Sequence, residues 1–160
     1  MPRFVQVIMM VFLALGLSGA LTSCDKNDDG PYKVQVRYTA ATTFTDYNSW
    51  DTGAVIGFLL TDETGKTVKG NVGHTMSGNE QKSGDTGEVN MAKNDIIEVD
   101  MRFPNVDTPQ KLQAMPTTTF IKTEILVNGK VKKTLLLDKN TPLGTSTIPS
   151  IQEKLKVGDL

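Results

Sequence analysis

Apolar and polar residues alternate in several short stretches of this chain, with the two-residue period of a strand that has one buried face. In residues 33–39 every second side chain is apolar, beginning at Val34. Residues 95–103 alternate in the same way and end before Pro104, which cannot donate to a strand ladder. Residues 54–61 are more continuously apolar. The pattern therefore predicts two half-buried strands and one central strand that is buried on both faces.

The clearest turn signal in the chain is the pair Asn128-Gly129, which separates the strand-like residues 120–127 and 130–137. Asn-Gly supplies the positive φ angles of a type I′ turn, so these stretches are predicted to form a hairpin. Lysines on its second arm would discourage aggregation through that edge. Residues 70–87 contain five glycines and predict a loop.

Helical periodicity is almost absent from the chain. One short helix is predicted over residues 110–115, because Thr108-Pro109 places a proline at the first helical position. About seven short strands, separated by turns rich in Gly, Pro and Asn, predict an all-β fold. Within that class we expect an antiparallel β-sandwich of the transthyretin-like or Ig-like type.

The first residues form a different pattern, in which Arg3 precedes a mostly apolar run over residues 4–20. Positive charge, an apolar core and then small residues is the order of a secretory signal peptide. Residues 21–24, Leu-Thr-Ser-Cys, resemble the lipobox of bacterial lipoproteins. The resemblance implies removal of residues 1–23 and acylation of Cys24. A retained membrane-spanning helix is the alternative, but the run is at the short end of the roughly 17–25 residues that cross a bilayer.

Removal of residues 1–23 would leave 137 residues (160 − 23), which suits one domain. We expect the acylated cysteine and a flexible acidic tether at residues 24–31, followed by a single β-sandwich domain at residues 32–160. An EF-hand loop that began at Asp25 would have Val36 at its twelfth position, where a ligating Glu is needed. We therefore predict no calcium site in the tether.

The acidic run after Cys24 resembles the export signal of surface-exposed lipoproteins of the Bacteroidetes. This resemblance implies a lipid-anchored protein on the outer face of the outer membrane. In enterobacteria an Asp at this place would instead imply retention at the inner membrane, so the host decides between the two locations. Several acyl chains would anchor the protein firmly, because each buried methylene contributes about 0.8 kcal/mol.

Charge and composition argue against several kinds of partner. Without Arg3 the chain has 16 basic residues (17 − 1) and 18 acidic ones, a net charge of −2. This lacks the basic excess that nucleic-acid binding needs. No cluster of His, Cys or spaced carboxylates in the sequence offers a closed metal shell. We expect no nucleic acid, no metal and no cofactor.

The only histidine is the first candidate for catalysis. His74 could form a triad with Ser77 or Ser83 and with Asp85. Catalytic geometry needs a rigid support, however, and these residues lie in the predicted loop. An exposed loop imidazole is the simpler interpretation.

Two carboxylates are the second candidate. Glu98 and Asp100 lie on one side of their predicted strand, about 7 Å apart, which falls between the separations of retaining and inverting glycosidases. An outward, solvated face with Arg102 as counter-charge is the simpler interpretation. Cys24 cannot act as a nucleophile once it is acylated. We therefore expect that the protein is not an enzyme.

Three aromatic residues, Phe44, Tyr47 and Trp50, recur at three-residue spacing before the central strand. Aromatic side chains on a loop can stack on sugar rings or anchor a protein interface. They can equally cover one end of the core, which we favour for a domain with a single Trp.

The order of segments resembles that of fimbrillin-like proteins, the subunits of Bacteroidetes surface fimbriae. A first strand at residues 32–41 and a Thr-rich stretch at 42–49 lead into Trp-Asp-Thr-Gly-Ala-Val-Ile-Gly-Phe at 50–58. Residues 96–104 are similar to the family's strand that ends in aromatic-Pro, and residues 148–159 to its late approach to a closing strand. The chain departs from the pattern at Ala54, where the family usually has Asp, and is about half the usual two-domain length.

The resemblance implies a structural or adhesive role at the cell surface. In that family subunits assemble by strand exchange after proteolysis, often following an arginine, so Arg37 is a candidate processing site and strand addition a candidate mode of partner binding. The alternative function is a non-catalytic accessory lipoprotein that captures glycans or other nutrients, with Phe44, Tyr47 and Trp50 as its contact surface.

Overall fold

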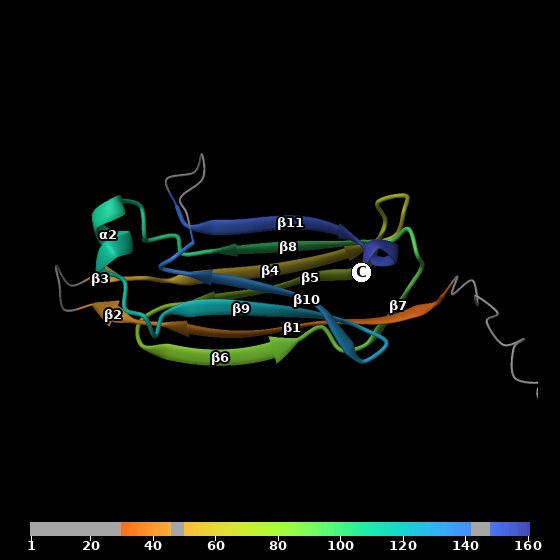
Figure 1. Ribbon diagram of the computed structural model, residues 1–160, viewed down its shortest axis with the longest axis horizontal. Helices are drawn as coiled ribbons and strands as arrows, with labels where there is room; N and C mark the ends of the chain where they lie inside the picture. The colour runs from red at the N-terminus through yellow and green to blue at the C-terminus, as the bar shows by residue number, and fades with distance from the viewer. Residues whose placement is uncertain (1–29, 46–49, 142–147) are drawn as a thin grey trace, which may run out of the picture.

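The structure is a computed structural model that describes residues 30–45, 50–141 and 148–160. Within these residues the chain is an antiparallel β-sandwich, which confirms the predicted all-β fold class (Figure 1). Five strands form the first sheet and four form the second. None of the described helices is long and apolar enough to cross a membrane.

The first sheet has the order β10-β9-β1-β6, with β7 also beside β1. Its strands are β1 (Tyr32–Thr42), β6 (Glu80–Asp85), β7 (Val89–Met91), β9 (Phe120–Val127) and β10 (Lys130–Asp138). The second sheet has the order β11-β8-β4-β5. Its strands are β4 (Ala54–Thr61), β5 (Thr67–Met76), β8 (Ile96–Arg102) and β11 (Ser150–Lys156). The remaining elements are β2 (Phe44–Thr45), β3 (Trp50–Asp51), the helix α2 (Pro109–Ala114) and the 3₁₀ helix η2 (Val157–Asp159).

The core lies between the two sheets. Every second residue of β1 and β8 is buried, as the alternation of their sequences predicts. The expectation that residues 54–61 are buried on both faces is wrong, because only one face of β4 packs against the core. Val55, Gly57 and Leu59 on the other face are only half-buried.

The prediction of a loop over residues 70–87 is also wrong. These residues form most of β5 and all of β6, which are edge strands paired with β4 and β1 respectively. An edge strand is half-solvated, so it does not need an alternating apolar pattern. Backbone pairing holds these strands in place, with Gly73 opposite Gly57 and Gly84 opposite Tyr38.

The predicted hairpin and helix are both confirmed. Asn128 and Gly129 have φ angles of 52° and 74° and join β9 to β10. Helix α2 begins with Pro109, and the side chain of Thr108 caps it by accepting a hydrogen bond of 3.2 Å from the amide of Lys111.

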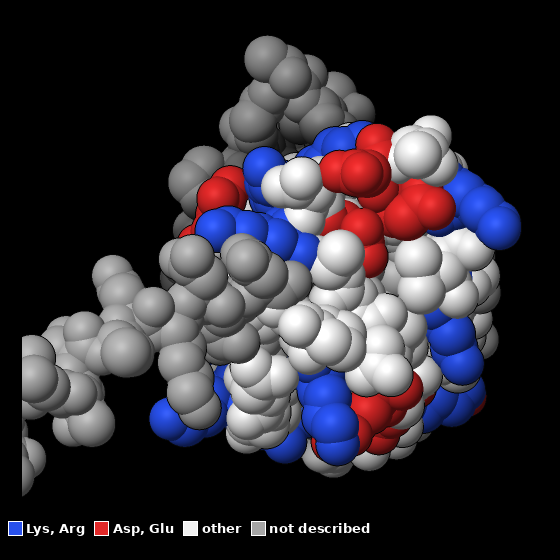
Figure 2. All heavy atoms as spheres, turned by 90° about the vertical axis from the view of Figure 1, so that its right-hand side faces the viewer, with Lys and Arg blue, Asp and Glu red and all other residues white. Residues whose placement is uncertain are grey.

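The sandwich has two distinct ends, which β1 connects. This strand of 11 residues begins beside β7 and η2 and ends beside β2, β3 and α2 (Figure 1), a span of about 35 Å at the rise of an extended strand. Figure 2 shows the end at which β1 begins, where lysine and arginine side chains surround an uncharged centre and acidic side chains form a large group at the top of the view and smaller groups at the left and bottom. We call the opposite end the tip.

Candidate functional site

The tip is built from segments that are far apart in the sequence. Its described residues are 42–45, 50–53, 77–81 and 108–120, which comprise the β2–β3 hairpin, the β5–β6 turn, helix α2 and the turn before β9. The three aromatic residues predicted as a contact surface belong to the hairpin or to the segment within it. The tip therefore holds the candidate binding surface.

The β2–β3 hairpin holds two of these aromatic residues. Phe44 pairs with Asp51, and Thr45 with Trp50. Trp50 is half-buried and packs against the core. Phe44 is 43% exposed. Tyr47 lies outside the described residues, so its predicted role stays a prediction.

The position of Trp50 agrees with the interpretation that it covers one end of the core. The ammonium group of Lys111 lies 5.5 Å from the centroid of the Trp50 ring, within the range of a cation–π interaction. Lys111 itself bridges to Asp107 at 2.7 Å. Trp50 therefore fixes helix α2 against the hairpin, whereas Phe44 presents its ring to solvent.

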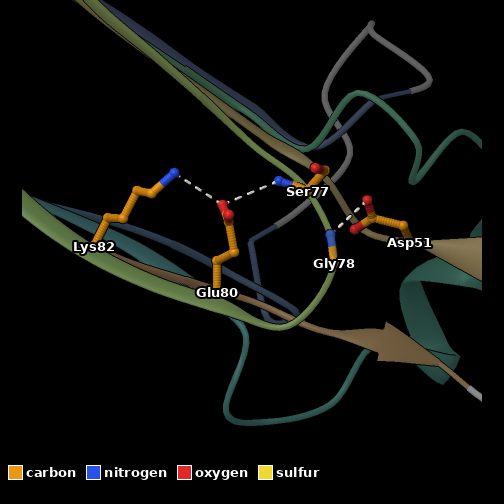
Figure 3. Close-up of polar contacts among 5 residues, drawn as sticks. All are labelled: Asp51, Ser77, Gly78, Glu80 and Lys82. Carbon is orange, nitrogen blue, oxygen red and sulfur yellow. Dashed lines mark hydrogen bonds and ion pairs between the residues drawn. The ribbon is translucent and has the colours of Figure 1, made fainter.

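Two hydrogen bonds fasten the hairpin to the β5–β6 turn. The amide of Gly78 donates to Oδ2 of Asp51 at 2.7 Å (Figure 3). The amide of Phe44 donates to Oδ1 of Asn79 at 2.6 Å. Gly78 has a φ of +70°, a conformation that favours glycine. Because Asp51 also accepts a bond from the amide of Gly53 at 2.8 Å, both of its oxygens are occupied.

Glu80, the first residue of β6 after the β5–β6 turn, is paired. Glu80 Oε2 lies 3.0 Å from the ammonium of Lys82 and also accepts a longer bond from the amide of Ser77 (Figure 3). The hydrogen bond from Lys82 lowers the pKa of the Glu80 carboxyl below its ordinary value. Glu80 is therefore ionised at neutral pH, with Lys82 as its counter-charge.

Threonines connect the hairpin to the turn before β9. The amide of Thr52 donates to the carbonyl of Thr43, and the amide of Thr43 donates to Oγ1 of Thr52, both at 3.2 Å. The hydroxyl of Thr119 donates to Oγ1 of Thr43 at 2.8 Å, and the amide of Thr119 donates to the carbonyl of Pro116. Three separate segments of the tip are thus held together by direct hydrogen bonds.

A hollow of about 540 Å³ opens among these segments, and we call it the tip hollow. Residues 41–43, 79–81, 117–118 and Phe120 line it. Thr42 is 4% exposed, and its Oγ1 is buried without a hydrogen-bond partner among the described residues. A buried hydroxyl without a partner is uncommon in proteins.

A second hollow, of about 580 Å³, lies on the outer face of β4, β8 and β11. Gly57 contributes no side chain to its floor, and Glu98 and Asp100 both line it. The expectation that Arg102 balances these carboxylates needs correction, because Glu98 pairs with Lys154 at 2.8 Å on the neighbouring strand. Oδ1 of Asp100 is buried and accepts no hydrogen bond from the described residues.

The histidine predicted to lie in a loop is on strand β5. The imidazole of His74 is exposed at its edge and lies 5.1 Å, between ring centroids, from Tyr38. Among the described residues no hydrogen bond joins His74 to Ser77, Ser83 or Asp85. Nor do three or more His, Cys, Asp or Glu side chains gather as metal ligands in residues 30–45, 50–141 and 148–160.

The candidate processing site Arg37 lies in the middle of β1. It pairs with Asp85 on one side and Glu124 on the other. Its Nε donates to Oε2 of Glu124 at 2.7 Å. A protease would therefore have to reach a strand with neighbours on both sides. Cys24, the candidate lipidation site, lies outside the described residues.

Sequence reasoning did not identify the residues of the tip hollow. Asn79, Gln81, Thr117 and Thr118 are ordinary turn and edge-strand residues, and no motif joins them. They come together because β6 and β9 both pair with β1, next to the hairpin that follows it.

No protein-family model matches the chain, and comparisons with curated proteins and with solved structures likewise gave no match.

Proposed function

We propose that this chain is a lipid-anchored protein of the bacterial cell surface with a structural or adhesive role, of the fimbrillin-like kind that its sequence resembles. Acylation of Cys24 would hold it at the outer membrane. A partner would then bind at the end of the domain that points away from the membrane.

The placement of the tip carries this proposal. Residues 24–31 lead directly into β1, which begins at Tyr32. An anchor on Cys24 would therefore hold the end of the sandwich where β1 begins. The exposed ring of Phe44 lies near the opposite end, on the hairpin that follows β1 (Figure 1). Exposed aromatic rings are favoured at protein and ligand interfaces.

Strand edges offer a second way to meet a protein partner. In the described residues β10 forms one edge of the first sheet and β6 and β7 form the other, and β11 and β5 are the edge strands of the second. An extended segment of another chain could add to such an edge through backbone hydrogen bonds. Cleavage after Arg37 would separate residues 24–37, including the acylated Cys24, from the rest of the domain. A strand of a neighbouring subunit could then take the place of residues 32–37 between β7 and β9 and hold the cleaved domain at the surface. This route supports the structural form of the proposed role.

Capture of a glycan or another nutrient is the second candidate function. It is favoured by one specific observation, the polar hollow beside Phe44 at the tip.

The proposal is tested by displaying the full-length protein on a Bacteroidetes host that does not otherwise make it. Surface antibody labelling and radiolabelled palmitate should both mark the wild type and should both be lost in Cys24→Ala. Cells that display the wild type should adhere to one another or to host-cell extracellular matrix more strongly than cells without it.

A matched pair of variants tests whether the tip is responsible. Phe44→Ala should reduce adhesion at least severalfold. Val131→Ala removes a side chain of similar exposure, 45% against 43%, but next to the Asn128-Gly129 turn at the anchored end. It should leave adhesion unchanged. Failure of surface labelling, or equal adhesion with and without the protein, would contradict the proposed function.

A further inference from the structure

We infer that the tip hollow is a binding site for a neutral carbohydrate, a deduction that rests on the proposed surface role and names its ligand. Four features of the hollow favour such a ligand: the functional groups that line it, its charge balance, the hydrogen bonds that hold its walls, and the exposed aromatic residue that adjoins it.

The exposed lining side chains are amides and hydroxyls. Asn79, Gln81, Thr117 and Thr118 are all exposed. A carboxamide offers both donors and an acceptor, and a hydroxyl offers one donor and two acceptor lone pairs. A sugar presents hydroxyl groups that also donate and accept. Lining groups that can both donate and accept hydrogen bonds therefore suit a sugar. An extended peptide would instead bind along the edge of a strand, through backbone hydrogen bonds.

The charge balance of the hollow favours a neutral ligand. Glu80 is the only charged residue among those that the structure places in the lining. Its carboxylate is paired with the ammonium of Lys82 at 3.0 Å. A sulfated or phosphorylated ligand would meet this carboxylate without a free cation in the lining to balance it. A cationic ligand would have to compete with Lys82 for it.

The walls of the hollow are held in place before any ligand binds. Thr43 accepts a hydrogen bond from the buried Thr119, which lies in the chain between the lining residues Thr118 and Phe120, and Asn79 is fixed by the amide of Phe44. Asp51 holds the adjacent Gly78 (Figure 3). A preformed site loses less conformational entropy on binding, which raises affinity for a small ligand. The hollow, of about 540 Å³, is shallow and open to solvent, so a ligand would lie on it and keep part of its hydration.

An exposed aromatic residue adjoins the lining in sequence and through its backbone. Phe44 follows Thr43 in the chain, bonds to Asn79 through its amide, and is 43% exposed. The face of an aromatic ring packs against the C–H groups of a pyranose, while the amides bond to its hydroxyls.

The experiment uses the full-length protein in detergent micelles. It is applied to an array of neutral oligosaccharides, with sialylated and sulfated oligosaccharides on the same surface. At least one neutral oligosaccharide should bind in preference to its charged counterparts. Its Kd is then measured by isothermal titration for the wild type and the variants.

Two pairs of variants locate the site. Gln81→Ala and Thr118→Val should each raise the Kd at least tenfold. Their controls, Gln152→Ala and Thr134→Val, make the same chemical changes at exposed positions on β11 and β10. They should leave the Kd unchanged. Urea midpoints of the four variants check that each is folded.

The inference is overturned if no neutral oligosaccharide binds, if only charged ones bind, or if the control variants weaken binding as much as the hollow variants. Adhesion of the displaying cells is measured in parallel. If adhesion depends on Phe44 but the protein binds no oligosaccharide on the array, the carbohydrate inference fails while the surface role stands. If the protein does not reach the cell surface, the surface role fails whatever the array shows.

Discussion

The ring of Tyr38 lies directly against the backbone of Gly84. A Cβ atom built on Gly84 would come within 2.9 Å of Cε1 of Tyr38 and 3.1 Å of its hydroxyl oxygen. Tyr38 is buried at 3% exposure in the central strand β1, and His74 approaches its ring from the edge strand β5. Gly84 on β6 thus leaves room for the ring of Tyr38, a core residue. The ring lies between β5 and β6, the two strands that the hydrophobic pattern of the sequence did not predict.

Gly84→Ala should therefore destabilise the domain. The added methyl group must displace the Tyr38 ring, and overpacking of this kind costs about 1–3 kcal/mol. The control is Gly70→Ala on β5, where a Cβ would meet no atom within 4 Å, and which should change stability by less than about 0.5 kcal/mol. Urea unfolding measures both. Equal stability of the two variants would contradict the close packing.

Elements whose own side chains set their structure could be predicted from the sequence. Apolar and polar residues alternate in strands β1 and β8. The pair Asn128-Gly129 specifies a hairpin turn through its own backbone preferences, independently of what the hairpin packs against. Strands β5 and β6 could not be predicted, because edge strands rich in glycine form through pairing with β4 and β1. Their polar residues look the same in a loop and in a solvated edge strand.

The candidate site was predictable only in part. Phe44 and Trp50 stood out because of their spacing, but the sequence could not say which ring is buried. That difference arises from the hairpin, in which neighbouring positions face opposite ways, and from Lys111 on a helix 61 residues later (111 − 50). The tip hollow joins residues 41–43, 79–81 and 117–120, and no local pattern links such distant stretches.

Trp50→Ala should destabilise the domain by about 2 kcal/mol. Removing a fully buried Trp costs about 3–5 kcal/mol, and Trp50 is half-buried. Phe44→Ala, on the same hairpin, should cost less than about 0.5 kcal/mol, because its ring packs outside the core. Urea unfolding compares the two. A larger loss from Phe44→Ala would reverse the assignment of the two rings.

The ion-pair group around Arg37 should be visible in an acid titration. Hydrogen bonds from Lys122 and then Arg37 hold the pKa of the Glu124 carboxyl below its ordinary value of 4.5. Because the folded-state pKa is depressed, the stabilising effect is present above about pH 4.5 and is lost as the pH falls through the folded pKa.

Arg37→Gln combined with Lys122→Gln should move the pKa of Glu124 back towards 4.5. The side-chain carboxyl resonance of Glu124, followed by NMR against pH, measures this directly. Lys82→Gln is the control, since Lys82 pairs with Glu80 and not with Glu124. A pKa of Glu124 that is the same in the wild type and the double variant would show that these contacts do not persist in solution.

Two buried threonines should respond in opposite directions to the same substitution. Thr42 Oγ1 has no hydrogen-bond partner among the described residues, whereas Thr119 Oγ1 donates to Thr43 at 2.8 Å. Valine has the shape of threonine without the hydroxyl, so Thr42→Val removes an unsatisfied group and should stabilise the domain by about 1 kcal/mol. Thr119→Val breaks a bond between two segments of the tip and should destabilise it by about 1–2 kcal/mol. Urea midpoints of both variants measure these changes. A destabilising Thr42→Val would contradict the assignment and show that a water or another group satisfies the Thr42 hydroxyl in solution.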